Sequence, residues 1–194
     1  GFAATLSDNS AIHASITNIT LSDGSTVEYT RAANQVITEF NTLSSSPSAT
    51  EYSTKGYYNL KVSGDNGIGT TGATVTAKTL ATNRVYVRND LLISDTKALL
   101  RIESNKAINV YNNVTNSGDE TNLVVESDGN LIQSKSTSTN GNTGKITVKR
   151  NANLKRLDYN YWGSPVSGQN LRNFSSGTLL NRFYVYNESN DYFD

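Results

Sequence analysis

The chain has 194 residues, 36% of them hydrophobic, and its 17 basic side chains balance 17 acidic ones. This size and hydrophobic content are typical of one globular domain. The zero net charge argues against a disordered chain and against nucleic-acid binding, which needs clustered cations. Because the chain contains no cysteine, disulfide frameworks, thiol catalysis and the common zinc sites are excluded.

Composition also bears on location and on secondary structure. No apolar run approaches the roughly 18 residues of a membrane span. The N-terminus does not resemble a signal peptide, and because the sequence has no initiating Met we expect a mature product or a fragment. Ser, Thr and Asn number 23, 23 and 25. Their side chains compete with helical hydrogen bonds, which favours strands and turns.

The first segment, residues 1–56, is expected to form an N-terminal cap or a first turn. Apolar residues recur at Ile12, Ile16, Ile19 and Leu21, and the sequence 25–29 then predicts a strand. The polar stretch 42–54 predicts an excursion loop rather than a domain linker, because apolar patterning resumes at residue 57.

The middle segment, residues 57–157, contains an internal repeat of 23 residues. The sequence 100–108 aligns with 123–131 and with 146–154, and a second alignment at the same step pairs 88–91 with 111–114. One apolar column runs through five repeats: Val62, Val85, Ile108, Leu131 and Leu154. A polar column, at which left-handed turns are tolerated, contains Asn105, Asp128 and Asn151.

Short strands that recur with the same columns are what a coil of parallel strands requires. Each turn stacks on the last about 4.8 Å away and buries the same inward positions. The sequence therefore predicts an all-β fold, a right-handed parallel β-helix (a β-solenoid) of about five turns, with the handedness taken from the chirality of parallel crossovers. The alternative fold is a β-sandwich, which short strands alone would also permit.

The last segment, residues 158–194, is rich in aromatic side chains. They are Tyr159, Tyr161, Trp162, Phe174, Phe183, Tyr184, Tyr186, Tyr192 and Phe193. The open end of a solenoid exposes unpaired strand edges and needs covering. We therefore expect an aromatic C-terminal cap in which Trp162 covers the last turn of the coil.

Candidate catalytic residues are few. The single histidine, His13, has no Ser or carboxylate pattern beside it, so a Ser-His-Asp triad is not indicated. Glu103 and Glu126 share a column and would lie roughly 5 Å apart on adjacent turns, a spacing that fits a retaining glycosidase. Lys149 continues this column, which favours an outward-facing ladder of charges. We expect no enzyme; the alternative is a polysaccharide lyase or glycosidase that uses Glu103 and Glu126.

Calcium and sugars are the remaining candidate ligands. The sequences 65–67 and 119–120 place oxygen ligands on turns, but no complete calcium loop occurs, so ordinary turns are favoured and no metal or other cofactor is expected. Tyr159, Tyr161 and Trp162 could stack on sugar rings, which makes a carbohydrate-binding module the second alternative. Burial of these rings in the cap is the preferred interpretation.

The sequences 23–29, 35–36, 57–64, 123–133 and 159–165 carry a family resemblance, and its most specific element is Asn160-Tyr-Trp-Gly163 followed by 182–187. They resemble the repeat region of very large secreted proteins that are exported by the bacterial type IX secretion system. Such proteins include adhesins and gliding-motility surface components. The resemblance covers most of the chain.

This resemblance implies a structural or adhesive segment of a secreted protein at the bacterial cell surface. The expected partners are the rest of a longer polypeptide, the outer-membrane export machinery of the type IX system and surface glycans. Neither nucleic acid nor a membrane span is expected.

Overall fold

The structure is a computed structural model that describes residues 21–39, 51, 54–135, 141–155, 158–164 and 166–193. Two compact units make up the chain, residues 1–151 and residues 152–194. The sequence changes character at residue 158, close to this division. The predicted strand at 25–29 is present, whereas residues 1–20 and most of the stretch 42–54 lie outside the described residues.

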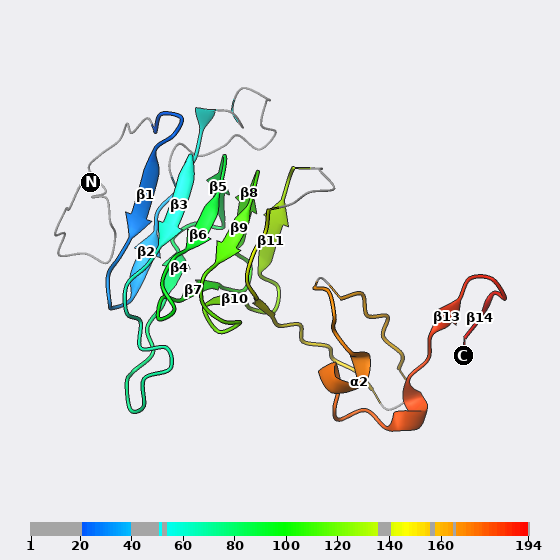
Figure 1. Ribbon diagram of the computed structural model, residues 1–194. Coiled ribbons are helices and arrows are strands. Elements are labelled where there is room, and N and C mark those ends of the chain that lie inside the picture. The colour runs from blue at the N-terminus through cyan, green and yellow to red at the C-terminus, as the bar shows by residue number, and fades with distance from the viewer. Residues whose placement is uncertain are drawn as a thin grey trace. The chain divides into compact units, whose positions relative to one another are not determined.

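The first unit consists of short strands in which inward and outward positions alternate, as in Leu91–Ile93 and Leu100–Ile102. In chain order they are β1 (Thr26–Tyr29), β2 (Gln35–Ile37), β3 (Asn59–Val62), β4 (Lys78–Leu80), β5 (Arg84–Val87), β6 (Leu91–Ile93), β7 (Leu100–Ile102), β8 (Ala107–Val110), β9 (Val114–Asn116), β10 (Leu123–Val125), β11 (Asn130–Gln133) and β12 (Thr147–Val148). Figure 1 labels β1 to β11 and shows β1, β3, β6 and β9 side by side, in the order of their sheet.

These strands form three parallel sheets. The first sheet has the order β1-β3-β6-β9, the second β12-β10-β7-β4-β2 and the third β11-β8-β5. From β4 to β11 the chain visits the second, third and first sheets in turn, so that each strand pairs with its counterpart one repeat away. Each pairing between the described strands of this unit is parallel, a pattern that a β-helix needs and an antiparallel β-sandwich lacks.

From β5 to β11, residues that lie opposite each other in neighbouring strands are 23 positions apart in the sequence. In the third sheet Val85 pairs with Ile108, and Ile108 pairs with Leu131. In the second sheet Leu100 pairs with Leu123 at the same step. The middle of the expected apolar column is therefore a row of directly opposed residues in neighbouring strands.

The first member of that expected column is wrong. Val62 lies in the first sheet, where it pairs with Tyr29 and Ile93, whereas Val85 lies in the third sheet. The reason is the long connection between β3 and β4, residues 63–77, which makes this turn longer than the later ones. Leu154, at the other end of the column, belongs to the second unit, and half of its side chain is exposed. That it continues the column stays a prediction.

The expected polar column holds for two of its three members. Asn105 and Asp128 adopt left-handed backbone conformations, with φ of 61° and 65°, which Asn and Asp tolerate better than other side chains. In the described part of the chain the only other non-glycine residue with positive φ is Asp191, so Asn151 does not repeat this turn. Gly144 has the equivalent freedom with φ of 90°, and a side chain there would clash with the Asn116 carbonyl.

Large apolar side chains from all three sheets form one buried cluster. Its fully buried members include Leu60, Val62, Val85, Leu91, Ile93, Leu100, Ile102, Ile108 and Leu123. Burial decreases towards the first and last strands, where Val27, Leu131 and Val148 are only partly buried. The core therefore lies between the sheets, and it includes fully buried side chains from edge strands, such as Tyr29 in β1 and Ile37 in β2.

The second unit has little regular structure. It contains the helix α2 (Leu171–Phe174), the 3₁₀ turn η1 (Leu180–Arg182) and an antiparallel pair, β13 (Tyr186–Asn187) and β14 (Tyr192–Phe193). None of its described residues is buried. Trp162 is half-buried and packs edge to face on Phe174, with ring centroids 4.9 Å apart. That Trp162 covers the last turn of the coil stays a prediction.

Candidate functional site

A ladder of amide side chains follows the turn that leads from the third sheet into the first. Asn89 Nδ2 donates to Asn59 Oδ1 at 2.8 Å, and Asn112 Nδ2 donates to Asn89 Oδ1 at 3.2 Å. Lys135 extends the ladder, since its Nζ donates to Asn112 Oδ1 at 2.7 Å. The alignment of 88–91 with 111–114 predicted that these polar positions stack. Their hydrogen bonds run from one repeat to the next and fix the corner of each turn.

The candidate catalytic residue Glu126 is held by two cations. Its Oε2 lies 3.0 Å from Lys149 Nζ, and its Oε1 lies 3.4 Å from Arg101 Nε. Glu103 occupies the equivalent position one repeat earlier, because Ile102 pairs with Val125. Opposite charges on neighbouring strands form a surface ladder of the kind that the column Glu103, Glu126, Lys149 predicted.

In the two turns that were candidate calcium sites, the carboxylate oxygens of Asp65 and Asp119 bind groups of the protein itself. Asp65 Oδ1 accepts the Gly67 N–H at 2.9 Å and Oδ2 pairs with Lys97 at 3.0 Å; these contacts lower the pKa of the Asp65 carboxyl. Asp119 Oδ1 accepts both the hydroxyl and the backbone N–H of Thr121, which lowers its pKa in the same way. Within the described ranges no three His, Cys, Asp or Glu side chains gather closely enough to hold a metal ion.

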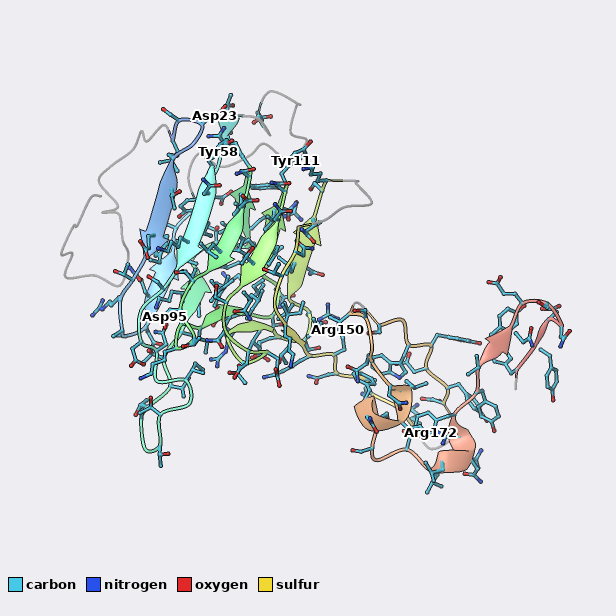
Figure 2. All side chains as sticks on the ribbon, in the orientation of Figure 1. Asp23, Tyr58, Asp95, Tyr111, Arg150 and Arg172 are labelled. Atoms are coloured by element: carbon cyan, nitrogen blue, oxygen red, sulfur yellow. The ribbon has the colours of Figure 1, made fainter. Side chains whose placement is uncertain are left out.

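Lys78 is a fully buried cation in the second sheet, where it pairs with Gln35 and Leu100. Its Nζ donates to the Ser63 carbonyl oxygen and to Asn66 Oδ1, both at 2.5 Å. Burial lowers the pKa of the Lys78 amine to about 8, although the negative charge of Asp95 partly opposes this. Figure 2 shows Asp95 at the end of the strands opposite Asp23.

Asn66 completes this buried corner and is itself only 1% exposed. Besides the Lys78 amine, its Oδ1 accepts the Leu99 N–H at 3.2 Å. Its Nδ2 donates to Thr76 Oγ1 at 2.9 Å, and the Thr76 hydroxyl in turn donates to the Ala32 carbonyl at 3.1 Å. The Lys78–Asn66 pair thus lies in a network that uses the polar atoms of both side chains.

Sequence reasoning missed Lys78 because the register between β4 and β7 is 22 residues, not 23: Lys78 opposes Leu100. An alignment of the sequence with itself at 23 residues places Arg101 opposite Lys78, and it therefore suggests that the Lys78 side chain points outward. The detectable signal is that an isolated Lys precedes the strand-like sequence of β4 in the row that later holds Leu100 and Leu123.

Two tyrosines form a second buried polar contact. The Tyr29 and Tyr57 hydroxyl oxygens lie 2.6 Å apart, and the Tyr57 hydroxyl donates to the Thr38 carbonyl. Because the single proton of the Tyr57 hydroxyl goes to this carbonyl, the Tyr29 hydroxyl donates to Tyr57, and it accepts the Thr38 N–H at 3.2 Å. Burial raises the pKa of both phenols, and that of Tyr57 rises well above 10.

The expected sugar-stacking residues lie in the second unit. Tyr159 and Tyr161 are 64% and 82% exposed. Tyr161 packs on Phe193, which also packs on Tyr186, with ring centroids 6.2 and 5.1 Å apart. Trp162 instead packs on Phe174. The structure therefore separates the three: two tyrosines present their rings to solvent, while the tryptophan is half-buried.

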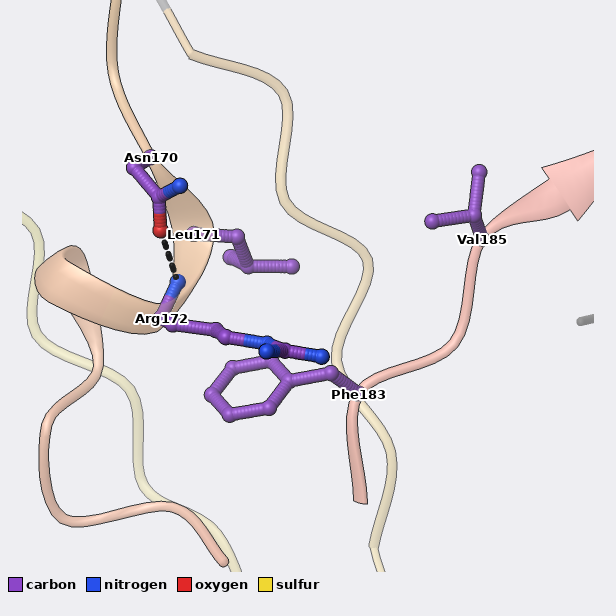
Figure 3. Close-up of a pocket in the computed structure, with 5 residues that line it drawn as sticks. All are labelled: Asn170, Leu171, Arg172, Phe183 and Val185. Atoms are coloured by element: carbon purple, nitrogen blue, oxygen red, sulfur yellow. Dashed lines mark hydrogen bonds between the residues drawn. The ribbon is translucent and has the colours of Figure 1, made fainter. Parts of the chain in front are cut away.

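A hollow of about 460 Å³ also lies within the second unit. It is lined by Asn170, Leu171, Arg172, Phe183 and Val185. Figure 3 shows the Arg172 side chain running beside the Phe183 ring, and Asn170 Oδ1 accepts the Arg172 N–H at 3.0 Å. The Asn170 oxygen also accepts the Asn173 N–H, so this amide caps the helix α2.

Comparison with known proteins places these features in a family. A family model described as a domain of unknown function (DUF8693) matches residues 66–193, which is more than half of the chain. No curated protein and no solved structure matches the chain. In the portion that the structure describes, no helix is long and apolar enough to span a membrane. His13 lies outside the described residues.

Proposed function

The chain belongs to the DUF8693 family, whose function is unknown, and we propose that it is a structural or adhesive segment of a secreted bacterial surface protein. In this proposal the three parallel sheets close into a right-handed parallel β-helix of about five turns. The aromatic segment 158–194 caps its C-terminal end.

The cyclic order of the strands supports the coil. A chain that passes from the second sheet to the third, then to the first and back, moves one strand spacing along an axis with each repeat. Crossovers between parallel strands are almost always right-handed because of the twist of the strands. A coil of this kind grows in length without changing its cross-section, which suits a spacer or stalk.

One observation carries the structural role: polar side chains are used to join one turn to the next. Asn59, Asn89 and Asn112 hydrogen-bond along the stack, and the Lys78–Asn66 pair connects the ends of the long excursion. Glu126 bridges neighbouring repeats through Arg101 and Lys149 rather than facing an open site. Such contacts resist bending and shear of one turn over another.

The location at the cell surface is supported by the resemblance of the sequence to type IX cargo proteins. On this proposal the export machinery of the outer membrane recognises parts of a longer polypeptide. The segment with the three sheets then remains outside the cell, where a stiff repeat holds other regions away from the surface.

Surface display provides the direct test. The excursion residues Thr71 and Gly72 are exposed, so an epitope inserted between them leaves the core unchanged. We expect antibody to label intact cells of the source bacterium, and labelling to disappear when the type IX machinery is deleted. The proposal is contradicted if the epitope is found in the cytoplasm of cells with and without the type IX machinery. It is also contradicted if surface labelling does not depend on that machinery. Deletion of the repeats with display retained should reduce adhesion.

The exposed rings favour a second candidate function, glycan binding by the second unit. Tyr159 and Tyr161 offer apolar faces to solvent, and a pyranose ring stacks on such faces. We expect Tyr161→Ala to abolish binding on a glycan array without changing stability. The matched control is Tyr111→Ala, because Tyr111 is also exposed, at 55%, but lies in the first unit. Equal binding by all three proteins excludes this function.

The same preparations test the enzyme alternative. A polysaccharide lyase or glycosidase that uses Glu103 and Glu126 requires that cleavage of acidic or neutral polysaccharides disappear in Glu126→Gln. We expect the unmodified protein to show no such cleavage. Cleavage that is lost in this variant would refute the structural proposal.

A further inference from the structure

We propose that Lys78 and Asn66 are joined by an intramolecular isopeptide bond, a covalent clamp across the base of the excursion between β3 and β4. The Lys78 amine contacts the Asn66 side-chain oxygen at 2.5 Å. Both side chains are buried, Lys78 fully and Asn66 to all but 1% of its surface. This modification goes beyond the proposed surface role, because it concerns how the chain is cross-linked and not where it acts.

The environment of Lys78 favours a reactive amine. Among the charged groups that the structure describes, Asp95 is the one whose charge acts on the buried amine, and the two direct acceptors, the Ser63 carbonyl and Asn66, are neutral. Burial disfavours the charged form of this lysine, and the pKa of about 8 leaves a useful fraction neutral. The neutral amine is the form that attacks a carbonyl carbon.

The environment of Asn66 favours the electrophile. The Leu99 N–H donates to Oδ1 at 3.2 Å and is placed to stabilise the negative charge that develops on this oxygen during attack. The Nδ2 that must leave donates to Thr76 Oγ1 at 2.9 Å, a contact that holds the plane of the amide in place. Nucleophile, carbonyl and oxyanion donor thus meet at one side chain.

The reaction is balanced without any oxidant or co-reactant. The lone pair of the neutral Lys78 Nζ forms a bond to Asn66 Cγ, and the carbonyl electron pair moves to Oδ1. Nζ gives up one proton and Nδ2 gains one, so that no net proton is taken up or released. The carbonyl re-forms, the bond from Cγ to Nδ2 breaks, and ammonia leaves. The product is a neutral secondary amide, which replaces a buried cation and so removes an unfavourable charge from the core.

The chain contains its own control for the role of burial. Lys135 Nζ donates to Asn112 Oδ1 at 2.7 Å, so the same two groups meet in the same way. Both residues of this pair are partly exposed. The pair is open to solvent, and we expect it to remain a reversible hydrogen bond.

Peptide mapping of the unmodified protein is the primary test. Trypsin cuts after free lysine and arginine, so an unlinked chain yields the peptides 62–78 and 79–84. A linked Lys78 is not cut, and we expect one peptide, 62–84, whose mass is lower by one ammonia than its sequence requires. Its fragment spectrum should lack breaks between residues 66 and 78, because these residues lie within a covalent ring. Lys135 and Asn112 should be recovered unlinked.

A second reaction that also releases ammonia must be distinguished. Asn66 precedes Gly67, a pair that can close to a succinimide through the Gly67 nitrogen. A succinimide leaves Lys78 open to trypsin and hydrolyses at mild alkaline pH, whereas the isopeptide does neither. A peptide 62–78 that has lost ammonia therefore overturns the proposal as clearly as a peptide 62–78 of full mass.

Variants give an independent readout. We expect Lys78→Met and Asn66→Ala chains to have the full mass that their sequences require, while Asn112→Ala keeps the loss of one ammonia. If the first two variants fail to fold, their intact masses under denaturing conditions still decide the matter. Loss of ammonia that persists in Lys78→Met places the modification elsewhere and excludes the clamp.

Discussion

Asn112 lies one 23-residue repeat after Asn89, and its side-chain Nδ2 donates a 3.2 Å hydrogen bond to the amide oxygen of Asn89. The neighbouring Asp90 strengthens the corner, because its Oδ1 accepts the same Nδ2 at 2.9 Å and the Asn113 N–H at 3.0 Å. A regularity in the sequence thus becomes a chain of hydrogen bonds from turn to turn. Asn89 hydrogen-bonds to side chains on both sides of it in the stack, so its removal takes one partner from each.

We therefore expect Asn89→Ala to lower the free energy of unfolding by about 1–3 kcal/mol, because the amides of Asn59 and Asn112 both lose a partner. Denaturant unfolding followed by circular dichroism measures the change. The matched control is Asn151→Ala, whose exposed side chain should matter by less than about 0.5 kcal/mol. Equal free energies of unfolding for the two variants would contradict a stabilising role of the amide ladder.

The tyrosine contact should be equally sensitive. Tyr57→Phe deletes the hydroxyl that bridges Tyr29 and the Thr38 carbonyl, so we expect a loss of about 1–3 kcal/mol. Tyr111→Phe, at a ring that is 55% exposed, is the control and should leave the unfolding midpoint unchanged. A stable Tyr57→Phe protein would show that this hydroxyl contributes little.

Alkaline pH provides a separate check on the same pair. Burial raises the folded-state pKa of Tyr29 and Tyr57 above 10, so the unfolded chain loses these protons first as the pH rises. Stability contributed by the protonated phenols is present below about pH 10 and is lost above it. We expect the stability of Tyr57→Phe to fall less steeply than that of the unmodified protein in denaturant titrations between about pH 9 and 11.

Formation of the Lys78–Asn66 bond should depend on pH. The pKa of the Lys78 amine is about 8, so the neutral nucleophile increases as the pH rises through that value and levels off above it. In chains made by cell-free translation and quenched with acid, we expect linking to be about tenfold slower at pH 7 than at pH 9. A rate that does not change with pH would mean that loss of the Lys78 proton does not limit the reaction.

Trp162 should stabilise the second unit through Phe174. Its half-buried ring packs edge to face at 4.9 Å, so we expect Trp162→Ala to cost about 2 kcal/mol and to speed cleavage within residues 158–193 by a low concentration of protease. Tyr161→Ala, at an 82% exposed ring, is the control. Trp162 acts as the cap of the coil if the midpoint for unfolding of the parallel sheets also falls, and it acts only locally if that midpoint is unchanged.

The 23-residue repeat made the strand pairing in the middle of the chain predictable from the sequence. Stacked strands bury the same positions, so Val85, Ile108 and Leu131 had to recur at one step, and they are paired in the third sheet. The left-handed turns at Asn105 and Asp128 follow for a local reason, because the backbone preference of Asn and Asp does not depend on distant contacts. The outward column of Glu126 and Lys149 was visible in the same way.

The pairing of the strands around the excursion between β3 and β4 could not be predicted from the repeat. A connection of irregular length between β3 and β4 shifts the register, so Val62 pairs with Ile93 instead of sharing a row with Val85. The shift also turns Lys78 inward against Leu100. The repeat length does not determine how many residues of an irregular connection lie outside the strands. That number depends on which inward side chains fit against the neighbouring strand.

The sequence by itself determined the strand content, the 23-residue register and the turns that need Asn or Asp, because these follow from local preferences and from identical side chains stacking on one another. Only the tertiary structure decided that Lys78 reaches Asn66 inside the protein and that Tyr29 meets Tyr57. These contacts join turns of unequal length, and a buried polar group must find its partner in three dimensions, wherever the chain supplies one.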